Sequence, residues 1–163
     1  MPRPERRKAE DGAAGPRVML ICCQGGHLMQ MLALKAAWEE LPRTWITTRA
    51  ADTEALLRDE HTIFAHVPTA RSIKNMFRNL WLAAVVVRRH RPTVLLSTGG
   101  GVTLPLFVVG KLVGARLIYV ESLTRVDGPS LTGRLVYPLV DRFFVQWPEA
   151  ATRRRMEFVG SVL

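Results

Sequence analysis

Apolar runs rich in β-branched and aromatic residues recur along the chain, and segments with apolar residues at helical spacing separate them. The runs predict strands at Val18–Cys23, Thr44–Thr48, Thr62–Val67, Thr93–Ser97, Arg116–Val120, Asp141–Val145 and Glu157–Val159. The intervening segments predict helices at Leu28–Trp38, Asp52–Arg58, Ser72–His90, Val102–Leu112 and Ser130–Leu139. Asp52 and Ser72 are the expected N-caps of their helices.

Strands that alternate with helices indicate an α/β protein with a Rossmann-like, mostly parallel sheet and helices on both faces. The length of 163 residues suits one domain, which we assign to residues 17–163. Residues 1–16 are charged and rich in Pro, Gly and Ala, without the apolar core of a signal peptide. We therefore predict a disordered leader there.

The chain is strongly basic, with a formal net charge of +9. Much of the excess lies between Arg71 and Arg91, where six basic residues occur without an acidic one. Such a charge favours anionic partners, which include phosphates, acidic lipids and nucleic acids. No nucleic-acid reader motif and no aromatic stacking platform accompanies the basic residues, so we exclude nucleic acid.

The predicted helix from Ser72 to His90 combines an apolar stripe with basic residues, which is typical of helices that lie in a membrane interface. Its candidate membrane contacts are Lys74, Phe77, Arg78, Trp81, Arg88 and Arg89. A core helix with a solvated basic flank is the alternative. No stretch approaches the roughly 20 apolar residues of a membrane span, so attachment would be peripheral.

Two glycine turns follow predicted strands, the first at Gly25 and Gly26 and the second at Gly99, Gly100 and Gly101. Ligands of parallel sheets bind outside the carboxyl ends of the strands, so both turns are expected on one edge with residues 121–125. Without side chains, backbone amides there can approach an anion such as a diphosphate. A tightly turned backbone without a ligand is the alternative for each turn.

His27 and Glu121 are the candidate catalytic residues, because His27 directly follows the first glycine turn and Glu121 stands at the end of the strand Arg116–Val120 on the same edge. A neutral His27 at a helix start could accept a proton from a sugar hydroxyl, and packing within the turn is the alternative. Glu121 could bind sugar hydroxyls, act as a base or pair with Arg125.

The cysteines give no sign of a metal site, since Cys22 and Cys23 are adjacent and lack metal-ligand spacing. We predict buried thiols in a reducing cytoplasm, no metal and no cofactor. A dinucleotide enzyme is disfavoured because the first turn lacks the G-x-G-x-x-G spacing.

Four short motifs, in this order and spacing, resemble the Alg-fourteen/PssD family of oligosaccharide and exopolysaccharide biosynthesis proteins. They are Gly25-Gly26-His27-Leu28, Ser97-Thr98-Gly99-Gly100-Gly101, Tyr119-Val120-Glu121-Ser122 and Phe144-Val145-Gln146-Trp147. The resemblance covers nearly everything from Arg17 to Leu163. It implies the N-terminal half of a GT-B glycosyltransferase such as MurG, with the nucleotide-sugar site on a separate small subunit.

The resemblance also implies roles for individual residues. Both glycine turns would face a polyprenyl-diphosphate-sugar acceptor, Glu121 would be the acidic position beside them, and Arg125, Ser130 and Arg134 would join the acceptor site. The carboxyl end from Phe158 to Leu163 would dock the subunit that binds the UDP-sugar.

The expected protein is thus a membrane-associated, acceptor-binding subunit of a two-component UDP-sugar glycosyltransferase, peripheral on the cytoplasmic face of the cell membrane. Eukaryotic members carry an N-terminal anchor, whereas the leader here is polar, so the sequence looks like a bacterial member. The alternative function is a non-catalytic activator or anchor that recruits and stabilises a catalytic glycosyltransferase subunit.

Overall fold

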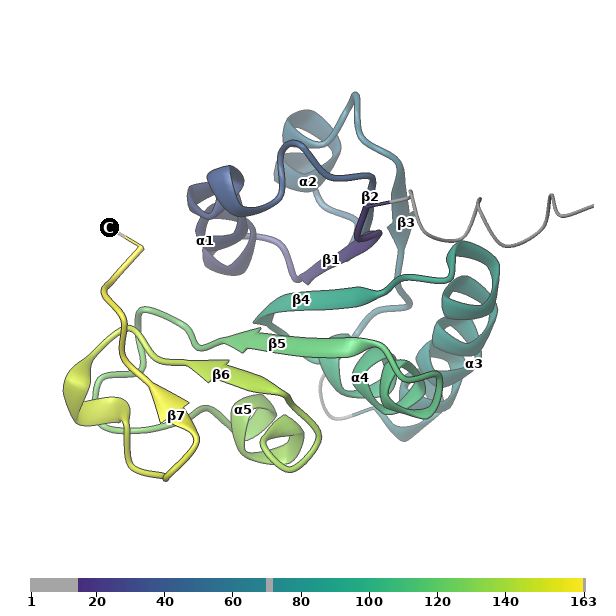
Figure 1. The fold of residues 1–163 in the computed structure, drawn as a ribbon. Helices are drawn as coiled ribbons and strands as arrows, with labels where there is room; N and C mark the ends of the chain where they lie inside the picture. The colour runs from purple at the N-terminus through teal and green to yellow at the C-terminus, as the bar shows by residue number, and fades with distance from the viewer. Residues whose placement is uncertain (1–14, 70–71, 163) are drawn as a thin grey trace, which may run out of the picture.

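The computed structural model describes residues 15–69 and 72–162. Nearly all of the predicted leader at residues 1–16 lies outside them. Within the described residues, seven strands form one parallel sheet in the order β3-β2-β1-β4-β5-β6-β7 (Figure 1). The strands are β1 (Val18–Cys22), β2 (Arg43–Thr47), β3 (Thr62–Phe64), β4 (Val94–Gly99), β5 (Arg116–Val120), β6 (Arg142–Phe144) and β7 (Met156–Glu157). The predicted fold class is confirmed.

Helices cover both faces of this sheet, as the alternation of elements predicted. They are α1 (Gly26–Ala33), α2 (Ala51–Leu56), α3 (Ile73–His90), α4 (Thr103–Leu112) and α5 (Leu131–Val136), with short 3-10 helices η1 (Lys35–Ala37) and η2 (Pro148–Ala150). One core packs α3, α4 and α5 against the sheet, and the other packs α1 against the opposite face, together with Trp38 and Leu57, which directly follow η1 and α2. Helix α1 itself contacts β1 and β4.

Two local predictions require correction. The predicted helix from Leu28 to Trp38 is two pieces, because α1 ends at Ala33 and η1 follows. The predicted cap Asp52 lies inside α2, whose N-cap is Ala50, and its carboxylate accepts a hydrogen bond from the amide of Gly25. The Asp52 side chain therefore binds the loop that follows β1 instead of capping the start of α2.

Helix α3 turns a partly polar face toward the core. Its buried residues include Asn75 and Asn79 beside Ala83, Val86 and Val87. The Asn79 amide donates to the carbonyl of His66 and accepts from the amide of the same residue, so it satisfies backbone groups of the preceding loop. The more apolar stripe of α3 therefore faces away from the core. The predicted N-cap is confirmed, because the Ser72 hydroxyl accepts a hydrogen bond from the amide of Asn75.

Candidate functional site

The three predicted loops meet at the carboxyl edge of the sheet. The imidazole of His27 bonds the Thr98 carbonyl at 2.8 Å, and the Thr98 hydroxyl donates to the His27 carbonyl at 2.7 Å. The buried amide of Gln30 donates to the Glu121 carbonyl and accepts from the Leu123 amide. These bonds tie the start of α1 to the ends of β4 and β5, so the predicted juxtaposition is confirmed.

The hydrogen bond of His27 decides which of its nitrogens is available. The Thr98 carbonyl can only accept, so Nδ1 carries the proton and donates. In the neutral ring Nε2 then has a free lone pair and can accept a proton. The ring is half-buried beside Gly99, where a Cβ would lie 2.9 Å from its Cε1. Gly99 therefore makes room for the imidazole.

The two glycines of the first turn differ in what they require. Gly25 has a φ of 73°, a conformation that L-residues rarely adopt, and its amide donates to Asp52 at 2.7 Å. Gly26 lacks a positive φ, and no atom lies within 4 Å of the position of a Cβ. Neither backbone geometry nor packing explains the glycine at position 26, so open space there suits the close approach of a ligand.

The second turn is glycine-rich for reasons of packing. A Cβ on Gly99 would meet His27, one on Gly100 would meet the side chain of Cys23, and one on Gly101 would meet the backbone of Thr69. Gly99 and Gly100 also have φ values of 114° and 97°. The tightly turned backbone therefore accounts for these three glycines without a ligand.

Glu121 is buried, at 1% exposure, and its carboxylate binds other groups of the protein. It accepts from the amides of Ser122 and Ser130 at 2.9 Å and from the Ser130 hydroxyl at 3.1 Å. No ion pair between Glu121 and Arg125 occurs among the described residues. This geometry gives Glu121 a positioning role in the β5–α5 loop, and direct contact with a substrate stays a prediction.

The other three candidate residues also lie in the β5–α5 region. Ser130 caps α5 by accepting the amide of Gly133, so its hydroxyl is engaged within the protein. Arg125 and Arg134 line a cavity of about 280 Å³, and Arg134 Nε donates to the Pro129 carbonyl. Asp127 lines the same cavity, so the two guanidinium groups and one carboxylate leave a net positive charge there, which suits an anion.

Two polar residues at this edge were missed by the sequence reading, Gln30 and Asp52. Gln30 follows His27 by one helical turn inside an apolar segment, and this exception to the pattern was the available signal. Nothing in the sequence joins Asp52 to Gly25, since 27 positions separate them. Their contact exists only because β1 and β2 are neighbours in the sheet.

The prediction of buried thiols is confirmed for Cys22, whereas Cys23 is half-buried. Burial raises the pKa of the Cys22 thiol to about 12, so it is protonated at neutral pH. Across residues 15–69 and 72–162, no group of three or more His, Cys, Asp or Glu side chains could hold a metal ion.

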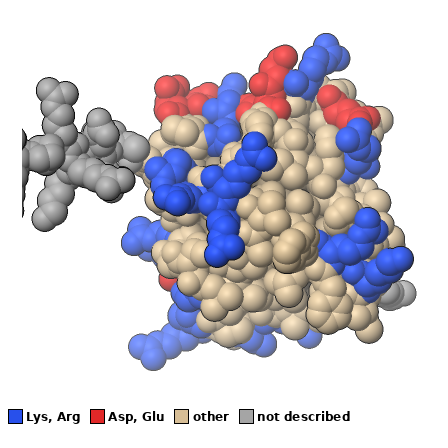
Figure 2. Space-filling view, turned by 90° about the vertical axis from the view of Figure 1, so that its right-hand side faces the viewer, with Lys and Arg blue, Asp and Glu red and all other residues tan. Residues whose placement is uncertain are grey.

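A second feature is the outer surface of α3 and α4, which Figure 2 shows as a broad tan area with Lys and Arg side chains around it. Phe77 and Trp81 are 62% and 74% exposed. Other exposed apolar residues of this surface, which we call the α3/α4 face, are Ile73, Met76, Leu80, Val85, Leu112 and Val113. The sequence analysis missed Leu112 and Val113 because their segment is predicted to be a buried helix.

In the described part of the chain, none of the helices is long and apolar enough to cross a membrane.

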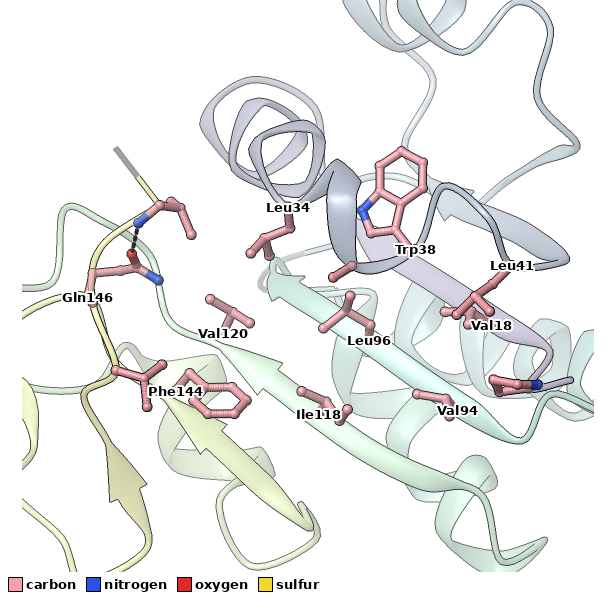
Figure 3. A pocket seen from close by; sticks show the side chains of 15 residues that line it. Val18, Leu34, Trp38, Leu41, Val94, Leu96, Ile118, Val120, Phe144 and Gln146 are labelled. Carbon is pink, nitrogen blue, oxygen red and sulfur yellow. Dashed lines mark hydrogen bonds between the residues drawn. The ribbon is translucent and has the colours of Figure 1, made fainter.

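A third feature is an apolar groove on the sheet face that α1 and η1 leave partly open (Figure 3). Its volume is about 410 Å³. Its floor comes from β4, β5 and β6, and its sides come from the η1 region and the carboxyl end of the chain. The residues that line it include Leu34, Trp38, Val94, Leu96, Ile118, Val120, Phe144, Val159 and Val162.

Solved structures with the same fold are GT-B proteins about twice as long. MurG of Acinetobacter baumannii superimposes with a TM-score of 0.74 at 14% identity, over 88% of this chain and 45% of MurG. The S. aureus MnaA structure with UDP gives a TM-score of 0.70 at 12% identity, over 91% of this chain and 46% of that one. The chain thus has the fold of the N-terminal half of a GT-B protein and spans just under half of their length.

Sequence relatives identify the family. A UDP-N-acetylglucosamine transferase subunit ALG14 of Candida albicans is 29% identical over 90% of this chain and 78% of its own length. The human protein of that name is 24% identical over 80% of this chain and 75% of its own. The family model described as "Oligosaccharide biosynthesis protein Alg14 like" matches residues 18–162. The chain therefore belongs to the Alg14-like family of oligosaccharide biosynthesis proteins, as the motifs predicted.

Proposed function

We propose that the chain is the acceptor-binding subunit of a two-component UDP-N-acetylglucosamine transferase that extends a polyprenyl-diphosphate-linked sugar. The environment of His27 carries the proposal. Its Nε2 has a free lone pair on the sheet edge where ligands of such folds bind, next to the open space over Gly26. The names of the family's curated relatives as transferase subunits support the same assignment.

The transfer needs a general base that takes the proton from the hydroxyl group of the acceptor sugar. As the acceptor hydroxyl oxygen bonds the anomeric carbon of the donor sugar, its proton passes to His27 Nε2. The bond from the anomeric carbon to the UDP oxygen breaks, and UDP leaves with the electron pair. The acceptor diphosphate would lie over Gly26, where a side chain would obstruct it, with Arg125 and Arg134 as cationic contacts.

The α3/α4 face would hold the protein against the cytoplasmic side of the cell membrane. Exposed aromatic residues can enter the headgroup region while nearby Lys and Arg side chains bind anionic lipids. An acceptor with a polyprenyl tail requires a transferase near the bilayer, so this face suits the proposed substrate. Attachment through it would be peripheral.

The apolar groove would receive a helix of the subunit that binds the UDP-sugar. Parallel sheets are covered on both faces, usually by helices, yet the floor of this groove is open over three strands. Val159 and Val162 at the carboxyl end line it, and this end is the expected docking segment. A helix with an apolar face would complete the layer that α1 and η1 begin.

Replacement of His27 by Ala tests the catalytic proposal in the complex with the partner subunit. Loss of a general base lowers turnover by about 100-fold or more. Complex formation persists because, among the described residues, the imidazole bonds the Thr98 carbonyl alone. Turnover is measured with UDP-N-acetylglucosamine and a lipid-diphosphate-sugar acceptor. Unchanged turnover would exclude His27 as the base and favour the alternative of a non-catalytic activator.

Glu121→Gln provides the contrast for that experiment. The amide keeps the shape but replaces an acceptor oxygen with a donor in a buried network, which costs about 1–3 kcal/mol of folding stability. A positioning role predicts lower thermal stability together with lower turnover. A fully stable variant without turnover would instead assign Glu121 a direct part in catalysis.

Gly26→Ala tests where the acceptor binds. The added methyl group fits the free protein, so the thermal midpoint stays unchanged or rises slightly, because Ala favours helix more than Gly does. We expect the KM for the acceptor to rise about tenfold with the KM for UDP-N-acetylglucosamine unchanged. Gly15→Ala, which also adds a methyl in open space, is the control. Wild-type acceptor kinetics in G26A would rule out close approach at this turn.

Sedimentation with anionic vesicles tests the α3/α4 face. Replacing Lys74, Arg78, Arg88 and Arg89 with Gln removes four charges at roughly 1 kcal/mol each near a lipid surface, so the protein should remain in the supernatant. A control variant removes four charges from exposed basic residues elsewhere, at Lys35, Arg49, Arg58 and Arg154. Equal loss of sedimentation in both variants would show that only net charge matters and would refute a dedicated face.

Ile118→Glu tests the groove as the partner's docking site. Ile118 lies on the groove floor and is half-buried, so the free chain tolerates the change, whereas a docked apolar helix would enclose an unpaired carboxylate. We expect the partner subunit to separate from the variant in size-exclusion chromatography after co-expression. Leu131→Glu, at a 73% exposed position on α5, is the control and should co-elute with the partner. A stable complex of I118E would place the docking site elsewhere.

A further inference from the structure

The end of α3 borders a cavity that the proposed transfer reaction does not use. Its volume is about 470 Å³, and it lies where α3 ends, β1 and β4 begin and α4 turns into β5. Arg17, Arg88 and Arg91 line it together with neutral residues such as Thr93 and Val113, and no acidic residue does. The cavity is therefore strongly cationic.

Arg17 is held in place by its neighbours. Its Nε donates to the Arg91 carbonyl at 3.0 Å, and its backbone amide and carbonyl both bond Thr93. Among the described residues, no hydrogen bond or ion pair engages the terminal nitrogens of Arg17. A fixed guanidinium with free terminal N–H groups is suited to bidentate binding of a phosphate.

The positive charge of the cavity has no internal counterpart. From His61 to Val120 the sequence contains eight Lys and Arg residues and not one Asp or Glu. In the part of the chain that the structure describes, the ion pairs involve neither Arg17 nor Arg88 nor Arg91. The three guanidinium groups repel one another, so an anion from outside would lower the energy of the folded state.

The surroundings of the cavity indicate the source of that anion. Leu112 and Val113 follow one another at the end of α4 and are 81% and 57% exposed, and Val113 lines the cavity itself. An apolar surface directly beside a cationic cavity matches a phospholipid, whose phosphate adjoins its acyl chains. Free phosphate has no apolar group that could contact Leu112 and Val113.

We propose that the cavity of Arg17, Arg88 and Arg91 is a binding site for the phosphate of an anionic phospholipid headgroup. Leu112 and Val113 lie against the lipid beside it. The inference rests on the proposed membrane contact of the α3/α4 face and adds a defined site to it. A bound headgroup would fix the orientation of the protein on the bilayer. Charge attraction alone does not define this orientation.

A titration of the full chain with dihexanoyl phosphatidylglycerol, below its micelle concentration, tests the site by calorimetry. Wild-type protein should bind with one saturable site. The exposed pair Arg88→Gln/Arg91→Gln should raise Kd about tenfold or more, because two charged phosphate contacts are lost. Lys74→Gln/Arg78→Gln removes the same charge from the other end of α3 and should bind the lipid like wild type.

Several results would overturn the site. Equally weakened lipid binding in both variants would show that only general attraction between the basic protein and the anionic lipid is involved. Displacement of the lipid by inorganic phosphate at equal affinity would show that the site binds the free ion. Vesicle sedimentation separates this inference from the membrane proposal. Binding to vesicles without binding to the short-chain lipid refutes the site alone, and the reverse result supports the site while the membrane contact fails.

Discussion

The apolar strands of a parallel sheet must be covered on both faces, and most features of this protein follow from how far that requirement is met. On one face, α3, α4 and α5 form a continuous layer over the strands. On the other face, α1 packs against β1 and β4, and Leu96, Ile118 and Phe144 line an open groove. The groove is therefore a part of the apolar sheet surface that the described residues leave uncovered.

Parallel strand order also assembles the candidate site. Because the carboxyl ends of β1, β4 and β5 meet at one edge, His27 reaches Thr98 and Gln30 reaches Glu121 across 71 and 91 positions of the chain. Two carboxylates then serve the loops themselves. Asp52 binds the amide of Gly25, and Glu121 binds the amides of Ser122 and Ser130. In the described part of the chain, no hydrogen bond engages Nε2 of His27, whereas both of these acidic groups bind backbone amides.

The surface of α3 reverses the usual relation between polarity and burial. Asn75 and Asn79 face inward because they satisfy backbone groups of the loop before the helix, while Phe77 and Trp81 remain exposed. Among the described residues, the basic side chains Lys74, Arg78, Arg88 and Arg89 of α3 take part in no ion pair. Apolar and cationic groups on one face are the combination that an anionic bilayer binds.

The sequence by itself determined the order of strands and helices, the parallel sheet, the two glycine turns and the family, because these depend on local periodicity and on short motifs. It also placed His27 on the same edge as the second glycine turn. It did not determine which face of α3 is buried, since that choice depends on backbone groups of His66 and Pro68 that only the folded loop presents. Nor did it connect Asp52 with Gly25 or bring Arg17 beside Arg91, pairs that lie 27 and 74 positions apart. Tertiary structure decided these contacts because strand neighbours are set by the packing of the whole sheet and not by distance along the chain.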